Sequence, residues 1–287
     1  MYKIITGIRN IFYNVGILRS HSFEIPIIVV GNLSVGGTGK TPQIEYLIRL
    51  LQKDYKIAVL SRGYKRKTKG FILIRDYHSV EEVGDEPFQF FKKFKQIDVA
   101  VDSNRVNGIK VLIDNVNPDI ILLDDAFQHR KVKAGFNILL SKYNDLFIDD
   151  LVLPAGNLRE SISGSKRADV IVVSKCPDDL KIEEQMTMSK RIQTYIQKPV
   201  FFTSISYAPL TKGYKGYSIS DFKENELFIV TGIANPKPLL EFLVKINFKI
   251  HHLEFPDHHF FTEEDIDKIK REFKDLPNNK ILLTTEK

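Results

Sequence analysis

The chain has 287 residues, of which 43% are hydrophobic and 27% charged. That length suits one large domain or two unequal ones, and the composition is that of an ordinary globular protein. Its single cysteine, Cys176, excludes an intrachain disulfide, so we expect a reducing compartment and a buried apolar thiol. The N-terminus lacks the apolar region of a secretory signal, and no uninterrupted apolar segment is long enough to span a bilayer. The net charge of +6 suits an anionic partner such as a nucleotide, a phosphorylated substrate or a membrane surface.

Apolar residues recur at helical spacing near the N-terminus, with Lys3, Arg9 and Asn14 on the remaining surface of the predicted helix. Such a helix could lie on an anionic membrane with its apolar face in the interface. It could instead pack that face against a sheet, and the pattern alone slightly favours this second interpretation. The apolar face consists of Ile4, Ile5, Ile8, Ile11, Phe12 and Val15.

A glycine-rich segment follows the first predicted strand, residues 27–30. Glycines in this segment lack Cβ, so the backbone can curl and direct its N–H groups at phosphate oxygens. Lys40 can reach the β- and γ-phosphates of a nucleotide, and the Thr41 hydroxyl suits Mg²⁺. The helix that Thr41 opens directs its positive end at the anion. The sequence therefore predicts a nucleoside triphosphate site, although serine stands where the strict motif has its first glycine. The predicted loop comprises Ser34, Val35, Gly36, Gly37, Thr38, Gly39, Lys40 and Thr41.

Apolar strands and amphipathic helices alternate after the loop. This alternation predicts an α/β fold of the P-loop NTPase type, with a doubly wound, mainly parallel sheet. We expect Asp85 to cap its helix, with Pro87 in the first turn. The predicted strands are 56–60, 71–74, 97–101, 120–123, 136–140 and 170–173, and the predicted helices are 42–52, 85–94, 103–114 and 183–196.

A smaller α/β domain is predicted at the C-terminal end, after an irregular connection at 207–220. Thr262 and Asp265 form a capping box for its second helix. Because the sequence stops directly after a strand, we expect a truncated chain. The predicted organisation is an amphipathic helix in 1–25, a kinase-like core in 26–206 and the smaller domain in 207–287. The smaller domain has predicted strands at 227–230, 248–253 and 280–283 and helices at 238–246 and 263–273.

Two aspartates, Asp124 and Asp125, directly follow the apolar strand 120–123. Carboxylates at the carboxyl end of a central strand face the nucleotide in a doubly wound sheet and can hold Mg²⁺. The alternative is a pair of solvated turn residues, but the preceding phosphate loop favours the metal role. Gln128, His129 and Arg130 follow within one turn and could contact phosphate or water.

Two further clusters carry groups suited to acid–base chemistry. Asp85 and Glu86 could act chemically, but a helix cap explains them as well. His258 and His259 could be metal ligands, an acid–base pair or surface residues. Zinc is the least favoured of these roles, because no cysteine or further histidine stands at a suitable spacing.

Together, several segments resemble the tetraacyldisaccharide 4′-kinase family of lipid A biosynthesis, in order along nearly the whole chain. The serine at the first loop position is similar to what that family uses. The resemblance implies transfer of the γ-phosphate of ATP, with Mg²⁺, to the 4′-hydroxyl of a lipid A disaccharide 1-phosphate precursor. It also implies a peripheral protein at the cytoplasmic face of the bacterial inner membrane. The matching segments are 30–42, 61–64, 84–87, 124–129, 153–160, 257–258 and 284–287.

The resemblance also implies roles for particular residues. Asp85 matches the family's catalytic base, His258 its paired histidine, and Glu86 lies beside the base. Asp124 and Asp125 match the carboxylate pair that serves the metal. The N-terminal helix becomes a membrane-contacting element, and we expect neither a nucleic-acid partner nor an obligate protein partner. Other residues that match the lining of the family's site are Arg105, Gln128, His129, Arg159 and Glu160.

Two other functions remain to be compared with a lipid kinase. A nucleotide-switched, membrane-associated ATPase or GTPase would share the strand and the loop, but no clear Asn-Lys-x-Asp guanine motif is present. Residues 174–178 are the nearest approach to that motif. A kinase for a soluble sugar or nucleotide would need no amphipathic N-terminus.

Overall fold

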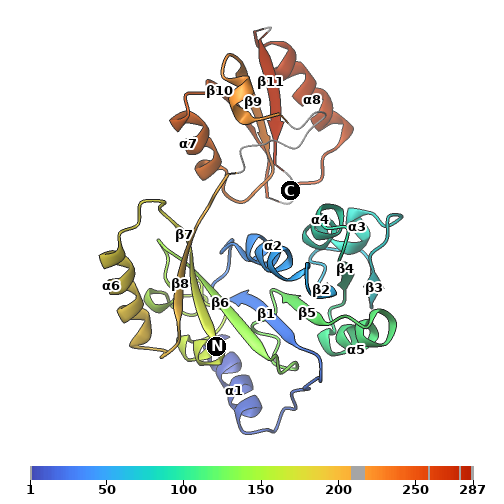
Figure 1. Ribbon diagram of the computed structural model, residues 1–287, viewed down its shortest axis with the longest axis vertical. Coiled ribbons are helices and arrows are strands. Elements are labelled where there is room, and N and C mark those ends of the chain that lie inside the picture. The colour runs from blue at the N-terminus through green and yellow to red at the C-terminus, as the bar shows by residue number, and fades with distance from the viewer. Residues whose placement is uncertain (1, 208–216, 258, 278, 286–287) are drawn as a thin grey trace. The chain divides into compact units, whose positions relative to one another are not determined.

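Two separate β-sheets organise the chain (Figure 1). The computed structural model describes residues 2–207, 217–257, 259–277 and 279–285. The chain divides into two compact units, Met1–Ile205 and Ser206–Lys287. The larger sheet lies in the first unit and the smaller sheet in the second.

The larger sheet has eight strands in the order β3-β4-β2-β5-β1-β6-β7-β8. All neighbouring strands are parallel except the edge strand β3, which runs antiparallel to β4. The loop-bearing strand β1 lies between β5 and β6, so the carboxyl ends of these strands share one edge. The strands are β1 (Ile27–Asn32), β2 (Ile57–Ser61), β3 (Ile72–Leu73), β4 (Asp98–Val101), β5 (Ile120–Asp124), β6 (Phe136–Lys142), β7 (Val170–Cys176) and β8 (Val200–Ser204).

Helices cover both faces of this sheet. The helices α2 (Lys40–Leu51) and α4 (Asp85–Lys93) pack in one hydrophobic cluster, and α5 (Arg105–Val116) and α6 (Ile182–Gln193) pack in the other. Ile44 and Ile48 of α2 are one helical turn apart and fully buried. Burial of each such side chain stabilises the fold by about 1.5–3 kcal/mol. The doubly wound, mainly parallel sheet predicted from the sequence is confirmed.

The N-terminal helix α1 (Tyr2–Asn14) leaves its apolar face in solvent. Ile4 is 65% exposed and Ile11 is 56% exposed, so this face does not pack against the sheet. A polar side of the helix holds it to the first unit, because Asn10 donates to Glu160 Oε2 at 2.8 Å. The interpretation of α1 as a helix whose apolar face packs on the sheet is therefore wrong. Among the described residues, no helix has the length and hydropathy needed to cross a bilayer.

The second unit is a three-stranded parallel sheet with one helix on each face. The predicted capping box is confirmed, because Asp265 N–H donates to Thr262 Oγ1 at 3.3 Å and Thr262 N–H donates to Asp265 Oδ2 at 2.8 Å. His259 also contacts Asp265, at 2.9 Å, and these bonds lower the pKa of that carboxyl to about 2. The elements are β9 (Glu226–Thr231), α7 (Lys237–Lys245), β10 (Ile250–Glu254), α8 (Glu263–Lys274) and β11 (Lys280–Thr284).

Several local details differ from the sequence-based expectations. Asp85 is the first residue of α4 rather than its cap, because Gly84 holds the cap position with φ 91°. Likewise, α2 begins at Lys40, after Gly39. Neither β8 nor the short helix α3 (Val80–Val83) is predicted from the sequence, and α3 has a single turn and hence no period to detect. The 3₁₀ helices are also not predicted, namely Phe147–Asp149, Ile162–Arg167 and Ile219–Phe222.

Candidate active site

The segment between β1 and α2 curls around the buried side chain of Asn32. Gly36 and Gly39 have φ of 95° and 86°, a region that glycine enters without steric cost. The Asn32 amide donates to the carbonyl of Ser34 at 2.7 Å, and its Oδ1 accepts from Lys40 Nζ at 3.4 Å. Asn32 is not among the predicted site residues, although a polar residue that ends an apolar strand is a usable signal.

Two loop residues differ in how their polar groups are used. The backbone N–H of Val35 donates to the carbonyl of Asn157 at 2.8 Å, so in this conformation it serves the fold. The Thr38 hydroxyl is buried and has no hydrogen-bond partner among the described residues. A buried hydroxyl without a partner is costly, and a phosphate oxygen would satisfy it.

Two lysines that the sequence analysis did not select lie against the outside of this loop. A Cβ placed on Gly36 would lie 3.8 Å from Lys142 Nζ, and one on Gly37 would lie 4.0 Å from Lys175 Nζ. Lys175 is half-buried at the end of β7 and has φ 59°. Burial, and then the charge of Lys142, lower its pKa. Two lysine amines held beside the same loop favour an anion there.

Asp125 follows β5 and meets two basic side chains. Arg159 Nη1 donates to both carboxylate oxygens, at 3.1 and 3.2 Å. Lys40 Nζ lies 3.6 Å from Oδ1. The residue has φ 44°, which aspartate tolerates better than most residues. The site thus brings together the loop lysine and one of the two aspartates that the sequence predicted at the carboxyl end of a central strand.

The Asp124 carboxylate is buried, and the positive charge near it offsets its negative charge poorly. Its carboxylate accepts from Ser61 Oγ at 3.2 Å, and its backbone carbonyl accepts from Arg105 Nη2, also at 3.2 Å. Burial raises the pKa of Asp124 to about 7, with the charges of Glu86 and Asp125 acting in the same direction. A divalent cation would offset this concentration of negative charge. The donor set therefore fits a hard cation such as Mg²⁺.

Within the part of the chain that the structure describes, no cluster of three or more histidine, cysteine, aspartate or glutamate side chains is arranged to hold a metal. Mg²⁺ in kinase sites is commonly held by one or two carboxylates together with phosphate oxygens and water. Thr41, Asp124 and Asp125 are the protein groups that suit such a site here.

The start of α4 is fixed against the loop after β2. A Cβ on Gly84 would lie 3.1 Å from the carbonyl of Tyr64, and one on Gly63 would lie 2.8 Å from that of Val83. These close backbone contacts hold Asp85 and Glu86 at the N-terminal end of α4. Thr41 Oγ1 donates to Glu86 Oε1 at 3.2 Å, so the first turns of α2 and α4 meet. His258, which the sequence analysis pairs with Asp85, lies outside the described residues.

Glu160 connects α1 to the site and is fully buried. Arg167 Nη2 donates to its Oε1 at 2.6 Å, and Gln128 Nε2 donates to the same oxygen at 3.3 Å. The side-chain amide of Asn10, in α1, donates to the other carboxylate oxygen, Oε2. Gln128 also donates to the carbonyl of Asn32 at 2.7 Å, at the base of the loop. Glu160 and Gln128 therefore form a hydrogen-bonded link between α1 and the phosphate loop.

Arg105 and His129 are both largely removed from water. Burial lowers the pKa of Arg105 to about 10, and the charge of Asp124 opposes this effect. The pKa of His129 is lowered to about 4, mainly by burial and then by the positive charges of Arg105 and Lys131. His129 is thus neutral at neutral pH, and its Nε2 has no hydrogen-bond partner in the described part of the chain. Positive charge dominates around this imidazole.

The fold and the site define the class of protein: a P-loop nucleotide-binding α/β protein with carboxylates placed as in phosphoryl-transfer enzymes. A family model described as LpxK, tetraacyldisaccharide-1-P 4′-kinase, matches residues 1–287. The chain belongs to this family, as its sequence resemblance predicted.

Relatives support the same assignment over most of their length. A tetraacyldisaccharide 4′-kinase of Flavobacterium psychrophilum is 54% identical over 291 residues, covering 100% of this chain and 83% of the relative. One of Flavobacterium johnsoniae is 50% identical over 289 residues, with the same coverage. The crystal structure of LpxK from Aquifex aeolicus in complex with ATP has a TM-score of 0.78 and 32% identity, covering 99% of this chain and 85% of that one. These findings confirm the predicted fold and favour a kinase over a nucleotide-switched binding protein.

Proposed function

We propose that this chain transfers the γ-phosphate of ATP to the 4′-hydroxyl of a tetraacyldisaccharide 1-phosphate in lipid A biosynthesis. Family membership over all 287 residues supports the reaction. The observation that carries it in the structure is the contact between Thr41 and Glu86. That contact brings the end of the phosphate loop to the helix turn that bears Asp85.

In this proposal the loop and Lys40 hold the β- and γ-phosphates, and the buried Thr38 hydroxyl takes a phosphate oxygen. Thr41, Asp124 and Asp125 would hold Mg²⁺, which when bound neutralises charge on the β- and γ-phosphate oxygens. Arg159 keeps Asp125 in place through its paired hydrogen bonds. Because phosphoryl transfer needs little covalent help, alignment and charge neutralisation supply most of the rate.

Asp85 is the proposed general base, which accepts the proton of the sugar hydroxyl as the phosphate is transferred. Its position in the first turn of α4, beside Glu86, supports this role. The pairing of Asp85 with His258 stays a prediction from the resemblance.

The nucleotide site of this proposal extends to Lys175. We expect Lys175→Met to weaken ATP binding about tenfold, or about 1.4 kcal/mol, because a half-buried cation beside Gly37 is removed. Isothermal titration with ATP measures the effect. The matched control is Lys181→Met, which changes an exposed lysine just before α6. Equal ATP affinity in the two variants would remove Lys175 from the site.

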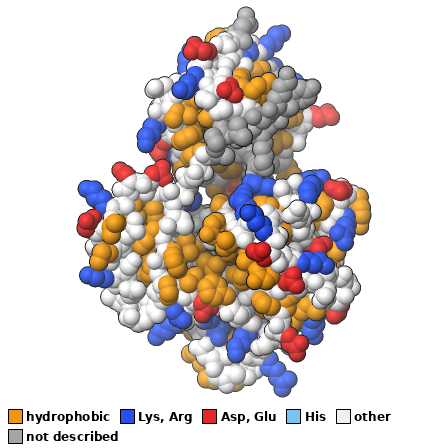
Figure 2. Space-filling view, in the orientation of Figure 1, with side chains coloured by type: hydrophobic (Ala, Val, Ile, Leu, Met, Phe, Trp, Pro, Cys, Tyr) orange, Lys and Arg blue, Asp and Glu red, His pale blue; other side chains and the backbone are white. Residues whose placement is uncertain are grey.

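We further propose that α1 rests on the cytoplasmic face of the inner membrane and that the protein is peripheral. Its exposed apolar face and the nearby Arg9 and Arg130 support this arrangement. Apolar and basic side chains are interspersed on the visible face of the first unit (Figure 2). The attachment of α1 to Glu160 would bring the membrane surface close to the loops of the site.

The membrane proposal predicts a measurable loss of lipid binding. We expect Ile5→Gln combined with Ile8→Gln to weaken binding to phosphatidylglycerol vesicles roughly tenfold, because two apolar side chains no longer enter the interface. Vesicle cosedimentation measures this binding. Ile182→Gln is the control, since Ile182 is 70% exposed but lies on α6. If the double variant binds vesicles as the control does, α1 is not the membrane contact.

One assay tests the reaction itself against its rivals. The protein is incubated with γ-labelled ATP, Mg²⁺ and the acylated disaccharide 1-phosphate in detergent micelles. We expect labelled lipid to form, and to form far more slowly with GTP. Triphosphate hydrolysis without labelled lipid would favour a nucleotide switch, and labelling of a soluble glucosamine disaccharide alone would favour a soluble-sugar kinase.

A further inference from the structure

Glu45 is a buried acidic residue on α2 that neither the sequence pattern nor the description of the site accounts for. Its side chain is only 8% exposed. It follows Thr41 by four residues, so the two side chains lie on the same face of α2. A charge removed from water is costly unless other groups pair with it. The partners of Glu45 therefore indicate what this position does.

Three side chains surround the Glu45 carboxylate. Lys93 Nζ lies 2.8 Å from Oε2, and Arg49 Nη2 donates to the same oxygen at 3.0 Å. Gln89 Nε2 donates to Oε1 at 3.2 Å. Arg49 belongs to α2, whereas Gln89 and Lys93 belong to α4. The Glu45 carboxylate thus joins these two helices.

The two α4 partners of Glu45 continue a row that begins in the first turn of that helix. Glu86, Gln89 and Lys93 are separated by three and four residues, so they lie on one face of α4. Glu86 meets Thr41 at 3.2 Å, and Glu45 meets the other two residues one turn further along α2. Polar contacts therefore tie α2 to α4 over two successive turns.

This polar row fixes the position of α4 along its axis. Phe90 and Phe94 are buried in the same hydrophobic cluster as Ile44 and Ile48 of α2, and they hold α4 against the sheet. Hydrophobic burial is non-directional, so it permits a small slide or rotation of the helix. Hydrogen bonds weaken with distance and angle and resist such a motion. Asp85, as the first residue of α4, moves with the helix.

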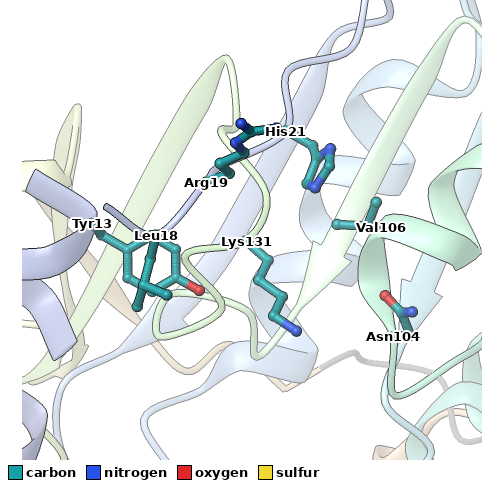
Figure 3. A pocket seen from close by; sticks show the side chains of 7 residues that line it. All are labelled: Tyr13, Leu18, Arg19, His21, Asn104, Val106 and Lys131. Atoms are coloured by element: carbon teal, nitrogen blue, oxygen red, sulfur yellow. The ribbon is translucent and has the colours of Figure 1, made fainter. Parts of the chain in front are cut away.

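The first turn of α5, on the opposite face of the sheet, has different surroundings. A pocket of about 260 Å³ lies beside it, with Asn104 on one wall and Tyr13, near the end of α1, on the other (Figure 3). None of the described residues that line this pocket belongs to α2 or α4. The first turn of α4 instead meets α2 directly, through Glu86 and Thr41. The contacts with α2 are therefore the ones that bear on the position of Asp85.

We propose that Glu45 is a positioning residue, which holds Asp85 at the distance from the phosphate loop that transfer requires. The inference rests on the proposed function, because Glu45 acts through α4 and the base that this helix carries. A displacement of about 1 Å can slow an aligned transfer about a hundredfold. Loss of the link should slow transfer but spare ATP binding, because Ile44 and Ile48 keep α2 on the sheet.

The test severs the link from the side of α4. The double variant Gln89→Met, Lys93→Met removes both partners on that helix and leaves Glu45 paired with Arg49, so no buried carboxylate loses all its counter-charge. We expect the rate constant of single-turnover transfer from γ-labelled ATP to the acceptor lipid to fall about tenfold. The Kd for ATP should stay within about twofold. Lys92→Met changes an exposed lysine of the same helix and should keep the rate.

A combination with Asp85→Asn separates positioning from a general structural role. If Glu45 acts through Asp85, severing the link should not slow the Asp85→Asn protein further, because effects that act through one group are not additive. A link that only stabilises the fold would slow both proteins by the same factor. The rate of lipid labelling in the four proteins of this cycle distinguishes the two roles.

The remaining outcomes each decide a separate point. If the double variant transfers phosphate at the original rate, or slows both proteins equally, the inference is overturned. If it weakens ATP binding as much as it slows transfer, the row serves the phosphate loop, and the inference also fails. If Asp85→Asn alone keeps the full rate, the assignment of the base fails and the inference fails with it. If the unsubstituted protein labels no lipid, the proposed function itself is wrong.

Discussion

Lys40→Ala should reduce kcat/KM for ATP by a factor of about 10²–10³, the cost typical of removing one preorganised contact to developing charge. The amine lies 3.6 Å from Asp125 and 3.4 Å from Asn32, at the mouth of the loop. Its loss removes a charge that lowers the pKa of Asp124, so the carboxylates would be less ready to accept a cation. The lost lysine contact and the raised pKa of Asp124 therefore both weaken ATP binding.

The measurement pairs calorimetric titration of ATP with turnover of the acceptor lipid. Lys53→Ala is the control, because this exposed lysine lies just beyond the far end of α2. The fold should survive in both variants, since Arg159 still holds Asp125 when Lys40 is removed. Undiminished ATP affinity and turnover in Lys40→Ala would contradict the assignment of the loop as the phosphate site.

Asp85→Asn should lower kcat by about 10²–10⁴ and leave ATP affinity close to that of the unsubstituted protein. The amide keeps the size of the carboxylate but cannot accept the proton of the sugar hydroxyl. The fold should tolerate the change, because Gly84 rather than Asp85 occupies the cap position of α4. The loss should therefore appear in the chemical step rather than in binding.

Single-turnover transfer to the acceptor lipid measures that step, with ATP binding followed separately. Asp76→Asn is the matched control, because the Asp76 side chain is 83% exposed and forms surface ion pairs with Lys92 at 3.7 Å and Lys95 at 4.0 Å. If Asp85→Asn transfers phosphate at the original rate, Asp85 is excluded as the base. If the same substitution abolishes ATP binding as well, Asp85 belongs to the nucleotide site instead.

The phosphate loop and its helix could be predicted because their signals are local. Gly36 and Gly39 stand where the backbone turns with positive φ, and the apolar run before them is a buried strand. The alternation of strands and helices likewise predicted the sheet. Helices follow β1, β3 and β4 along the chain, and such alternation of strands and helices leaves few topologies to choose from.

Other parts of the site depend on contacts between distant segments. Lys142 and Lys175 reach the loop from the ends of β6 and β7, and nothing in their neighbouring residues indicates that position. The link from Asn10 to Glu160 joins residues 150 positions apart. The sequence predicts the cap of α4 one residue too late. An acidic residue at the start of a helix is a common cap, so the pattern favours Asp85 as the cap and Gly84 as part of the loop, whereas Gly84 holds the cap position.

The position of the transferred phosphate on the lipid tests the central claim most directly. The labelled product is isolated from the complete reaction with ATP and Mg²⁺ and examined by proton–phosphorus correlation NMR. We expect a new phosphate monoester coupled to the proton at carbon 4′, with the 1-phosphate unchanged. A phosphate at any other hydroxyl, or ATP consumption with no new lipid phosphate, would contradict the account.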